Sequence, residues 1–340
     1  MRIGILKLSS LGDVIHALPV AHALRRHFPR AHLTWVAEAR EARLLVNHPD
    51  LDAVVAVDTR RWRRRFWRPG TAREIGEILR QLGMARLDVA LDLQGLIKSG
   101  ILAAWTRAPL RIGFGPSHLR EPMNALFTNR RVVPPLEAVH VVEQYLALLG
   151  PLGITDRRPV FTIPLSPDAE RWVDAFLTDR GVKPSDRLVA LNVGAGRPEK
   201  RWPQGHWRRL AEGLAVEAGV RLLVLWGPGE EPLAASVSRG LPTSPLLAPR
   251  TTLDELAAFL RRAVLVLAAD TGPLHLAAAL GTPCVGLYGP TSGARNGPYG
   301  GHCRVLESPD GRMASLEPEA VLGAVSDLLA SSASAAGGRA

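Results

Sequence analysis

An acidic side chain follows the first apolar stretch of the chain. The segment KLSSLGDVIHALP comes directly after RIGIL and places Asp13 at the start of an expected helix, with Ser10 and Gly12 in the preceding turn. A carboxylate at this position could be an N-cap, or it could take a proton from a hydroxyl nucleophile. His16 lies one helical turn further along a similar face, and we interpret it as a structural or supporting residue.

A glycine-rich turn followed by a lysine predicts a phosphate site in the second half of the chain. The segment GAGRPEKRWP contains Ala195 and Gly196 in the turn, then Arg197 and Lys200. Backbone N–H groups of such a turn can bind an anion, and a lysine adds a positive charge. The spacing is not that of the Walker pattern, and an ordinary polar loop with a solvated lysine is the alternative interpretation.

A third stretch, AADTGPLHLAAALGTPCVGLYGP, joins an apolar strand to a helix. The strand ends at Asp270, Thr271 and Gly272 open the helix, and His275 lies one turn into it. N–H groups at the positive end of a helix suit a diphosphate. Asp270 could cap the helix or orient hydroxyl groups of a sugar or ribose.

A basic segment, TRRWRRRFWR, occupies residues 59–68 and contains six arginines and the aromatic residues Trp62, Phe66 and Trp67. A solvated loop, single-stranded nucleic acid binding and binding of an anionic lipid headgroup all fit this composition. The chain has no RNP, helix-turn-helix or zinc-finger pattern that would favour nucleic acid.

The elements that would position these residues are short apolar strands alternating with helices, which is typical of parallel α/β sheets. Strands are expected at 2–6, 32–37, 53–57, 88–94, 111–114, 187–196, 219–227, 263–270 and 283–290, and helices near 13–27, 39–47, 71–82, 95–104 and 137–150. The proline-containing segment 156–172 separates two such halves. We therefore expect two doubly wound domains, which bind ligands beyond the carboxyl ends of their strands.

The expected boundaries divide the chain into four parts. Residues 1–165 and 166–315 form the two domains, residues 316–330 form a helix that packs back on the N-terminal domain, and residues 331–340 form a disordered tail. The tail SSASAAGGRA is small and polar, which favours disorder.

The composition favours an anionic partner and a cytoplasmic location. The 340 residues include 42 Lys and Arg against 32 Asp and Glu, a formal charge of +10. The two cysteines, Cys284 and Cys303, lack metal-type spacing, and the chain has neither a signal-peptide layout nor an apolar run of the ~20 residues that a membrane span needs.

These segments resemble the signatures of the bacterial ADP-heptose:lipopolysaccharide heptosyltransferases, glycosyltransferase family 9. The segments that carry the resemblance are KLSSLGDVIHALP, RPEKRWP and ADTGPLHLAAALGTPCVGLYGPT, in this order along the chain, with a weaker match in EAVHVVEQYLALLG. The form SSLGDVIH is most similar to heptosyltransferase I.

The resemblance implies a GT-B glycosyltransferase with two Rossmann-like domains facing a central cleft. Such an enzyme transfers heptose, with inversion, from ADP-L-glycero-β-D-manno-heptose to the Kdo of Kdo₂-lipid A. It needs no metal or cofactor beyond this donor and binds no nucleic acid. It works as a monomer at the cytoplasmic face of the inner membrane.

The resemblance also implies roles for particular residues. Asp13 matches the catalytic base, and Lys200 matches the lysine that binds phosphate. The other implied donor-binding residues are Ala195, Gly196, Asp270, Thr271, Gly272, His275 and either Glu230 or Glu231, and the implied acceptor-binding residues are Ser10, Gly12, Arg60, Arg61, Arg64 and Arg120.

The chain departs from the family pattern in two places, and other functions remain open. Ala195 and Gly196 stand where hydroxyl residues are common, which leaves phosphate binding to backbone N–H groups, and Pro273 replaces a more usual leucine. The alternatives are a heptosyltransferase acting on a later core heptose, a sugar-nucleotide epimerase, a basic nucleic-acid-binding protein and a Rossmann oxidoreductase. The oxidoreductase would need Gly-x-Gly-x-x-Gly after the first strand, where the chain lacks it.

Overall fold

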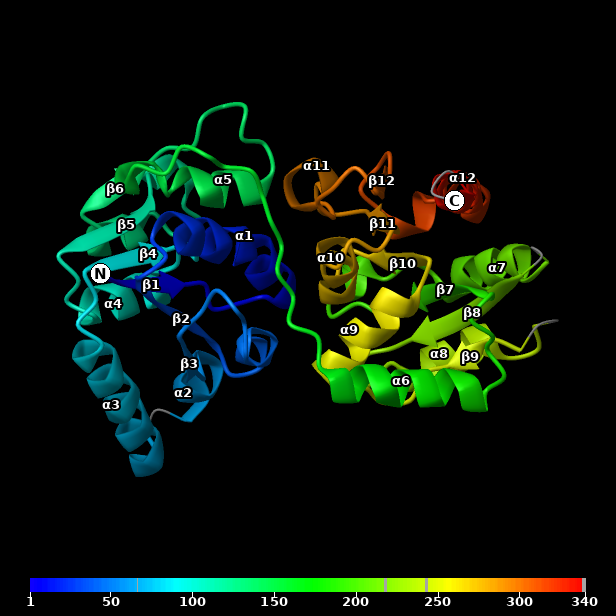
Figure 1. The fold of residues 1–340 in the computed structure, drawn as a ribbon, viewed down its shortest axis with the longest axis horizontal. Coiled ribbons are helices and arrows are strands. Elements are labelled where there is room, and N and C mark those ends of the chain that lie inside the picture. The colour runs from blue at the N-terminus through cyan, green and yellow to red at the C-terminus, as the bar shows by residue number, and fades with distance from the viewer. Residues whose placement is uncertain (66, 217–218, 242–243, 338–340) are drawn as a thin grey trace. The chain divides into compact units, whose positions relative to one another are not determined.

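The structure, a computed structural model, describes residues 1–65, 67–216, 219–241 and 244–337. The chain divides into two compact units, Met1–Pro164 and Leu165–Ala340. Phe66, one of the aromatic residues of the basic segment, lies outside the described residues. Each unit is a parallel α/β sheet (Figure 1).

The first unit contains a six-stranded parallel sheet in the order β3-β2-β1-β4-β5-β6. Its strands are β1 (Arg2–Leu6), β2 (His32–Glu38), β3 (Ala53–Val57), β4 (Val89–Asp92), β5 (Leu110–Phe114) and β6 (Arg130–Val132). Its α-helices are α1 (Leu11–His27), α2 (Thr59–Arg65), α3 (Pro69–Met84), α4 (Ile97–Trp105) and α5 (Val141–Ala147). The central strands are almost wholly apolar because helices cover both of their faces.

The second unit repeats this plan with the strand order β12-β11-β10-β7-β8-β9. Its strands are β7 (Arg187–Asn192), β8 (Val220–Leu225), β9 (Leu246–Leu247), β10 (Leu265–Ala269), β11 (Cys284–Tyr288) and β12 (Cys303–Glu307). Its α-helices are α6 (Pro167–Asp179), α7 (Gln204–Ala215), α8 (Glu231–Ser238), α9 (Leu253–Arg262), α10 (Gly272–Ala279), α11 (Gly293–Asn296) and α12 (Pro318–Gly337).

Two sets of helices cover the second sheet. Helices α7, α8 and α12 pack together on one face, and α6, α9 and α10 form the other set. On the first of these faces, alternate strand residues such as Leu222 and Val224 of β8 meet Trp207 and Leu210 of α7. A parallel sheet with helices on both faces is doubly wound, as the sequence pattern predicts. This arrangement confirms the expected α/β fold class.

Most predicted strands and helices are present, with differences at elements that carry weak signals. The helix expected near 39–47 is a 3₁₀ helix at Glu41–Leu45, and the one expected at 137–150 is shorter, because His140 caps α5 by accepting from the Val142 N–H at 3.2 Å. Strands β6, β9 and β12 were not predicted: β9 has two residues, and β6 and β12 are largely exposed edge strands whose sequences lack an apolar run.

The C-terminal helix α12 extends beyond its predicted end at residue 330. It belongs to the second unit and packs on α7, because Val321, Val325 and Leu328 form a helical stripe that joins the core beside Trp207. The helix continues over residues 331–337, which were expected to be disordered, because alanine and serine are compatible with helix. Residues 338–340 lie outside the described part. Among the described residues, no helix is long and apolar enough to cross a membrane.

Candidate active site

Four loops of the second unit meet at one edge of its sheet. The strands are parallel and in register, with Asn192 of β7 opposite both Leu225 of β8 and Ala268 of β10, and Ala269 opposite Leu287 of β11. The chain therefore leaves β7, β8, β10 and β11 at a common carboxyl edge, where ligands of doubly wound sheets bind. The sequence-predicted donor residues all follow one of these strands.

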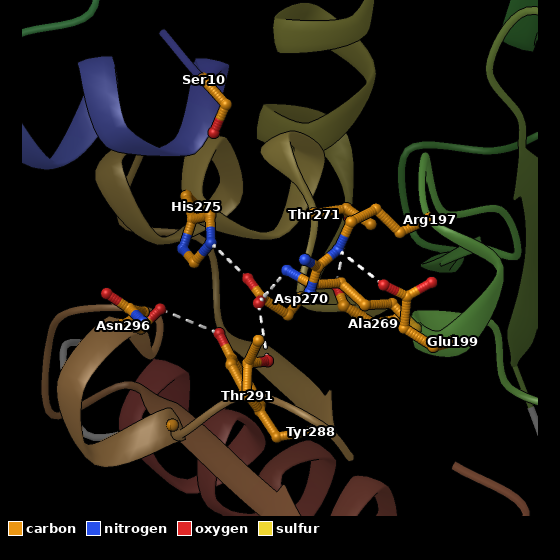
Figure 2. Close-up of polar contacts among 12 residues, drawn as sticks. Ser10, Arg197, Glu199, Ala269, Asp270, Thr271, His275, Tyr288, Thr291 and Asn296 are labelled. Carbon is orange, nitrogen blue, oxygen red and sulfur yellow. Dashed lines mark hydrogen bonds and ion pairs between the residues drawn. The ribbon is translucent and has the colours of Figure 1, made fainter. Parts of the chain in front are cut away.

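Asp270 is the centre of a polar cluster at this edge (Figure 2). Its Oδ2 forms an ion pair with the Lys200 ammonium and accepts a hydrogen bond from the Thr291 hydroxyl at 2.8 Å. Its Oδ1 lies 3.2 Å from Nε2 of His275, which is buried in α10. The structure thus brings together Lys200, Asp270 and His275, which the sequence separates by up to 75 positions.

The partners of Asp270 set its charge. Burial, the largest single influence, raises its pKa, but the hydrogen bonds and charges of His275 and Lys200 together lower it by more. The pKa of Asp270 therefore lies well below its usual range, and the group stays anionic at neutral pH. A carboxylate held in this way orients Lys200 and is a poor proton acceptor.

Helix α10 begins directly beside this cluster. Thr271 is its N-cap residue, and the Thr271 hydroxyl donates to the Ala269 carbonyl at 3.0 Å. Gly272 and Pro273 occupy the first helical positions, so the amide groups of the first turn face the same edge as Lys200. The positive end of the helix and the lysine charge together favour an anion.

The glycine-rich turn after β7 lies against Glu230. A side chain at Gly194 would place its Cβ 1.7 Å from the Glu230 carboxylate and would displace it, whereas Gly196 has open space at that position. Glu230 accepts a hydrogen bond from the Gly227 N–H at 2.8 Å and precedes α8, while Glu231 is exposed in the first turn of that helix. The sequence could not distinguish Glu230 from Glu231. In the structure, only Glu230 of these two lies beside the glycine-rich turn.

Ala195 and Gly196 differ in accessibility. Ala195 is buried, and its carbonyl accepts from the Arg201 guanidinium at 3.0 Å, whereas Gly196 is exposed. Arg197 pairs with Glu199 at the surface (Figure 2), whereas Lys200 pairs with Asp270. Of these two residues, only Gly196 has its backbone exposed to solvent.

In the first unit, Asp13 follows β1 at the carboxyl edge of the sheet. Its Oδ2 accepts hydrogen bonds from the Ser10 N–H at 2.9 Å and from the Ser10 hydroxyl at 2.7 Å, which closes the turn before α1. Gly12 is buried in the same turn. The Asp13 side chain is 41% exposed, so the capping role leaves part of the carboxylate open to solvent.

Two residues that support this turn were not predicted from the sequence. Lys7 is buried, and its ammonium lies 3.7 Å from Oδ1 of Asp13 and 4.8 Å from the centre of the Tyr145 ring. The side-chain oxygen of Gln94 accepts from the N–H groups of Leu8 at 2.9 Å and Ser9 at 3.1 Å. The position of Lys7 directly after the strand RIGIL could have indicated this contact, because a buried lysine needs a partner.

The surroundings of Lys7 keep it charged. Burial, the largest influence, lowers its pKa, but Tyr145, Asp13 and Asp92 raise it, and the pKa ends above its usual value. The predicted supporting residue His16 is buried near this turn and packs edge-on against His140, with ring centres 5.2 Å apart. Helix α1 thus contacts the N-cap residue of α5 through this pair of rings.

The predicted acceptor arginines lie in two segments that follow strands of the first sheet. Arg60, Arg61 and Arg64 are exposed on α2, which follows β3, and Arg120 is exposed in the loop after β5. Arg61 forms ion pairs with Asp58 and Glu74, whereas Trp62 turns inward and packs on the core beneath α3. Residues 59–65 of the basic segment are therefore helical, and Trp62 contributes to the core.

Among the described residues, no three His, Cys, Asp or Glu side chains are grouped so that they could hold a metal ion.

Two units that each contain a six-stranded parallel sheet in Rossmann-like order are the architecture of the GT-B fold. Residues 75–325 match the family model described as glycosyltransferase family 9 (heptosyltransferase). The chain therefore belongs to glycosyltransferase family 9, as the sequence resemblance predicts.

Individual relatives agree over nearly the whole chain. Lipopolysaccharide heptosyltransferase 1 of Escherichia coli K12 is 31% identical over 96% of this chain and 100% of its own length. The Pseudomonas aeruginosa protein of the same name is 34% identical over 88% of this chain and 82% of its own. A solved structure described as E. coli heptosyltransferase WaaC with ADP has 29% identity and a TM-score of 0.82, covering 96% of this chain and all of that one.

Proposed function

We propose that this enzyme transfers L-glycero-D-manno-heptose from ADP-heptose to the inner-core Kdo of Kdo₂-lipid A, with inversion at the anomeric carbon. The observation that carries the proposal is the partly exposed Asp13 carboxylate, held at the carboxyl edge of the first sheet in a family 9 chain. The names of the similar proteins support lipopolysaccharide as the acceptor, and the ADP-bound neighbour supports an adenine nucleotide donor.

Asp13 acts as the general base in this proposal. A Kdo hydroxyl oxygen attacks the anomeric carbon of the heptose, the bond from that carbon to the diphosphate oxygen breaks, and Asp13 receives the hydroxyl proton. The two hydrogen bonds from Ser10 hold one carboxylate oxygen, and Lys7 lies beside the other. Such positioning keeps the base oriented before the acceptor arrives.

The second unit binds the donor in this proposal. Lys200, oriented by Asp270, and the first turn of α10 stabilise the negative charge that develops on the departing ADP. His275 supports Asp270 from the buried side of the donor site. Glu230, and not Glu231, is assigned to the ribose, because Glu230 lies against the phosphate-binding turn.

The exposed arginines bind the acceptor. Arg60, Arg64 and Arg120 present guanidinium groups that suit the carboxylates and phosphates of Kdo₂-lipid A. Arg61 contributes charge, although it is already paired with Glu74. This basic surface also fits a protein working at the anionic cytoplasmic face of the inner membrane.

A transfer assay distinguishes this proposal from its alternatives. The full chain is incubated with ADP-heptose and either Kdo₂-lipid A or a core that already carries heptose. Mass spectrometry follows the lipid, and NMR of the product determines the anomeric configuration. We expect one heptose on Kdo₂-lipid A with inverted configuration. Transfer only to the heptosylated core would make this a later heptosyltransferase, and consumption of the donor without any acceptor would indicate an epimerase.

A further inference from the structure

The two cysteines, which the proposed transfer reaction does not use, face each other in the second sheet. Cys284 opens β11 and Cys303 opens β12, and the two residues are direct register partners in this parallel pair. Side chains of register partners project from the same face of a sheet, and here the two Sγ atoms are 3.3 Å apart. Both are free thiols in this structure.

His302 completes a three-residue group. Its Nε2 lies 3.1 Å from the Ala278 carbonyl in the last turn of α10, so Nε2 carries the hydrogen. The imidazole also hydrogen-bonds Cys303. Gly300, whose φ is +134°, leaves room for the ring, since a Cβ there would lie 2.5 Å from Cε1 of His302.

The arrangement makes the two thiols chemically unequal. The hydrogen bond with Cys284, followed by the influence of His302, lowers the pKa of Cys303 to about 6 despite partial burial. The hydrogen bond with Cys303 and burial raise the pKa of Cys284. Cys303 is only half-buried, whereas Cys284 is fully buried. A thiolate that is accessible and has a thiol next to it is the arrangement of a peroxide-reactive cysteine with a resolving partner.

We propose that Cys303 and Cys284 form a redox-modifiable site at which hydrogen peroxide produces a reversible intrachain disulfide between β12 and β11. The Cys303 thiolate attacks one peroxide oxygen, the O–O bond breaks, and hydroxide leaves, giving a sulfenic acid on Cys303. The Cys284 sulfur then attacks the Cys303 sulfur, the S–O bond breaks, and the departing oxygen and the Cys284 proton leave as water. Two thiols are oxidised, and one peroxide is reduced to two waters. This site is independent of the proposed transfer reaction.

Intact mass spectrometry tests the site directly, because the chain contains only 2 cysteines. The folded full-length protein is titrated with hydrogen peroxide near neutral pH and then treated with dithiothreitol. We expect the monomer to lose the mass of two hydrogens, and dithiothreitol to restore it. Added oxygen without loss of hydrogens, disulfide-linked dimers, or no change under conditions that oxidise free cysteine would each overturn the proposal.

Single variants test the assigned roles. In Cys284→Ser, the sulfenic acid on Cys303 has no resolving thiol and should be trapped by dimedone, whereas Cys303→Ser should give little adduct because Cys284 is buried. Circular dichroism verifies that each variant is folded. Equal trapping in two folded variants would contradict the assignment of Cys303 as the attacking thiol.

The pH dependence of the wild-type reaction tests the part played by His302. We expect the rate of peroxide oxidation to be half-maximal near pH 6 and to shift upward in His302→Gln, with the exposed His27→Gln as the control. A rise of about one pKa unit would lower the thiolate fraction at pH 6 about fivefold. An unchanged profile in His302→Gln would remove the histidine from the site.

Discussion

Each half of the molecule has an aspartate where a central strand leads into the helix that follows it, and the two carboxylates have different surroundings. Asp13 follows β1 at the start of α1, and Asp270 follows β10 at the start of α10. Asp13 is 41% exposed and is held by Ser10 and Lys7, whereas Asp270 is 10% exposed and bonded to Lys200, His275 and Thr291.

This difference shows that the number and charge of the partners decide what a carboxylate can do. The partners of Asp270 occupy both of its oxygens and lower its pKa, which suits an orienting group. Asp13 keeps part of its surface open, which suits a group that must accept a proton. Five experiments test this comparison, from the largest expected effect to the smallest.

Replacing the open carboxylate should remove most of the activity without unfolding the protein. We expect Asp13→Asn to lower kcat by about 10²–10⁴, because general-base assistance is lost while the amide oxygen can still accept from Ser10. Steady-state kinetics and thermal unfolding measure the two effects. Asp168→Asn, at an exposed carboxylate in the first turn of α6, is the matched control and should retain activity. A near-normal kcat in Asp13→Asn would refute the role of Asp13 as base.

Removing the cation that Asp270 orients should cost almost as much. We expect Lys200→Met to lower kcat by about 10²–10³, the usual effect of losing one electrostatic contact in the transition state. Arg197→Met is the control, because it removes a neighbouring exposed cation whose described ion pair is with Glu199. It should have a much smaller effect on kcat. Equal losses in both variants would mean that general positive charge, and not the orientation of Lys200, supports catalysis.

The pH dependence of the free energy of unfolding should reflect the lowered pKa of Asp270. The pKa of Asp270 is lower in the folded than in the unfolded state, where it is about 3.9. Its contribution to stability is therefore fully present above that unfolded value and is lost as pH falls through it toward the lower folded pKa. We expect urea unfolding of the wild type to weaken more steeply between about pH 5 and pH 2 than that of Asp270→Asn. Parallel profiles would contradict the assigned charge state.

Two glycines of the same turn provide a matched pair. A Cβ at Gly194 would overlap Glu230, whereas one at Gly196 meets no atom within 4 Å. Gly194→Ala should raise KM for ADP-heptose and lower stability by roughly 1–3 kcal/mol through overpacking, while Gly196→Ala should be close to wild type. Donor titrations and thermal unfolding measure both quantities. Equal KM values in the two variants would separate Glu230 from donor binding.

The smallest effect concerns the exposed arginines of the basic segment. Arg60→Glu and Arg64→Glu should raise KM for the lipid acceptor and weaken its dependence on salt, with no change in KM for ADP-heptose. Arg61→Glu should also lose the ion pair with Glu74 and so destabilise α2. If acceptor KM ignored both salt and charge reversal, the basic segment would be a solvated surface without a role in acceptor binding.

Local sequence predicted much of the fold and part of the site. Apolar strands such as RLVAL and VLVLA are recognisable because both faces of a parallel strand are buried, and the turns after them contain the polar residues of both edges. The contacts of Lys7 were not predictable, because they join residues up to 138 positions apart. The packing of α12 on α7 was not predicted, because an apolar helical stripe does not specify which surface covers it.

By itself, the sequence determined the alternation of strands and helices, the division into two halves and the family signature, because these depend on residue periodicity and on motifs within short segments. Only the tertiary structure decided that Glu230 and not Glu231 lies beside the glycine turn, that Asp270 is locked by Lys200 and His275, and that Cys284 faces Cys303. Each of these depends on strand register and packing between distant segments, which bring side chains within a few ångströms and so set their charge and reactivity.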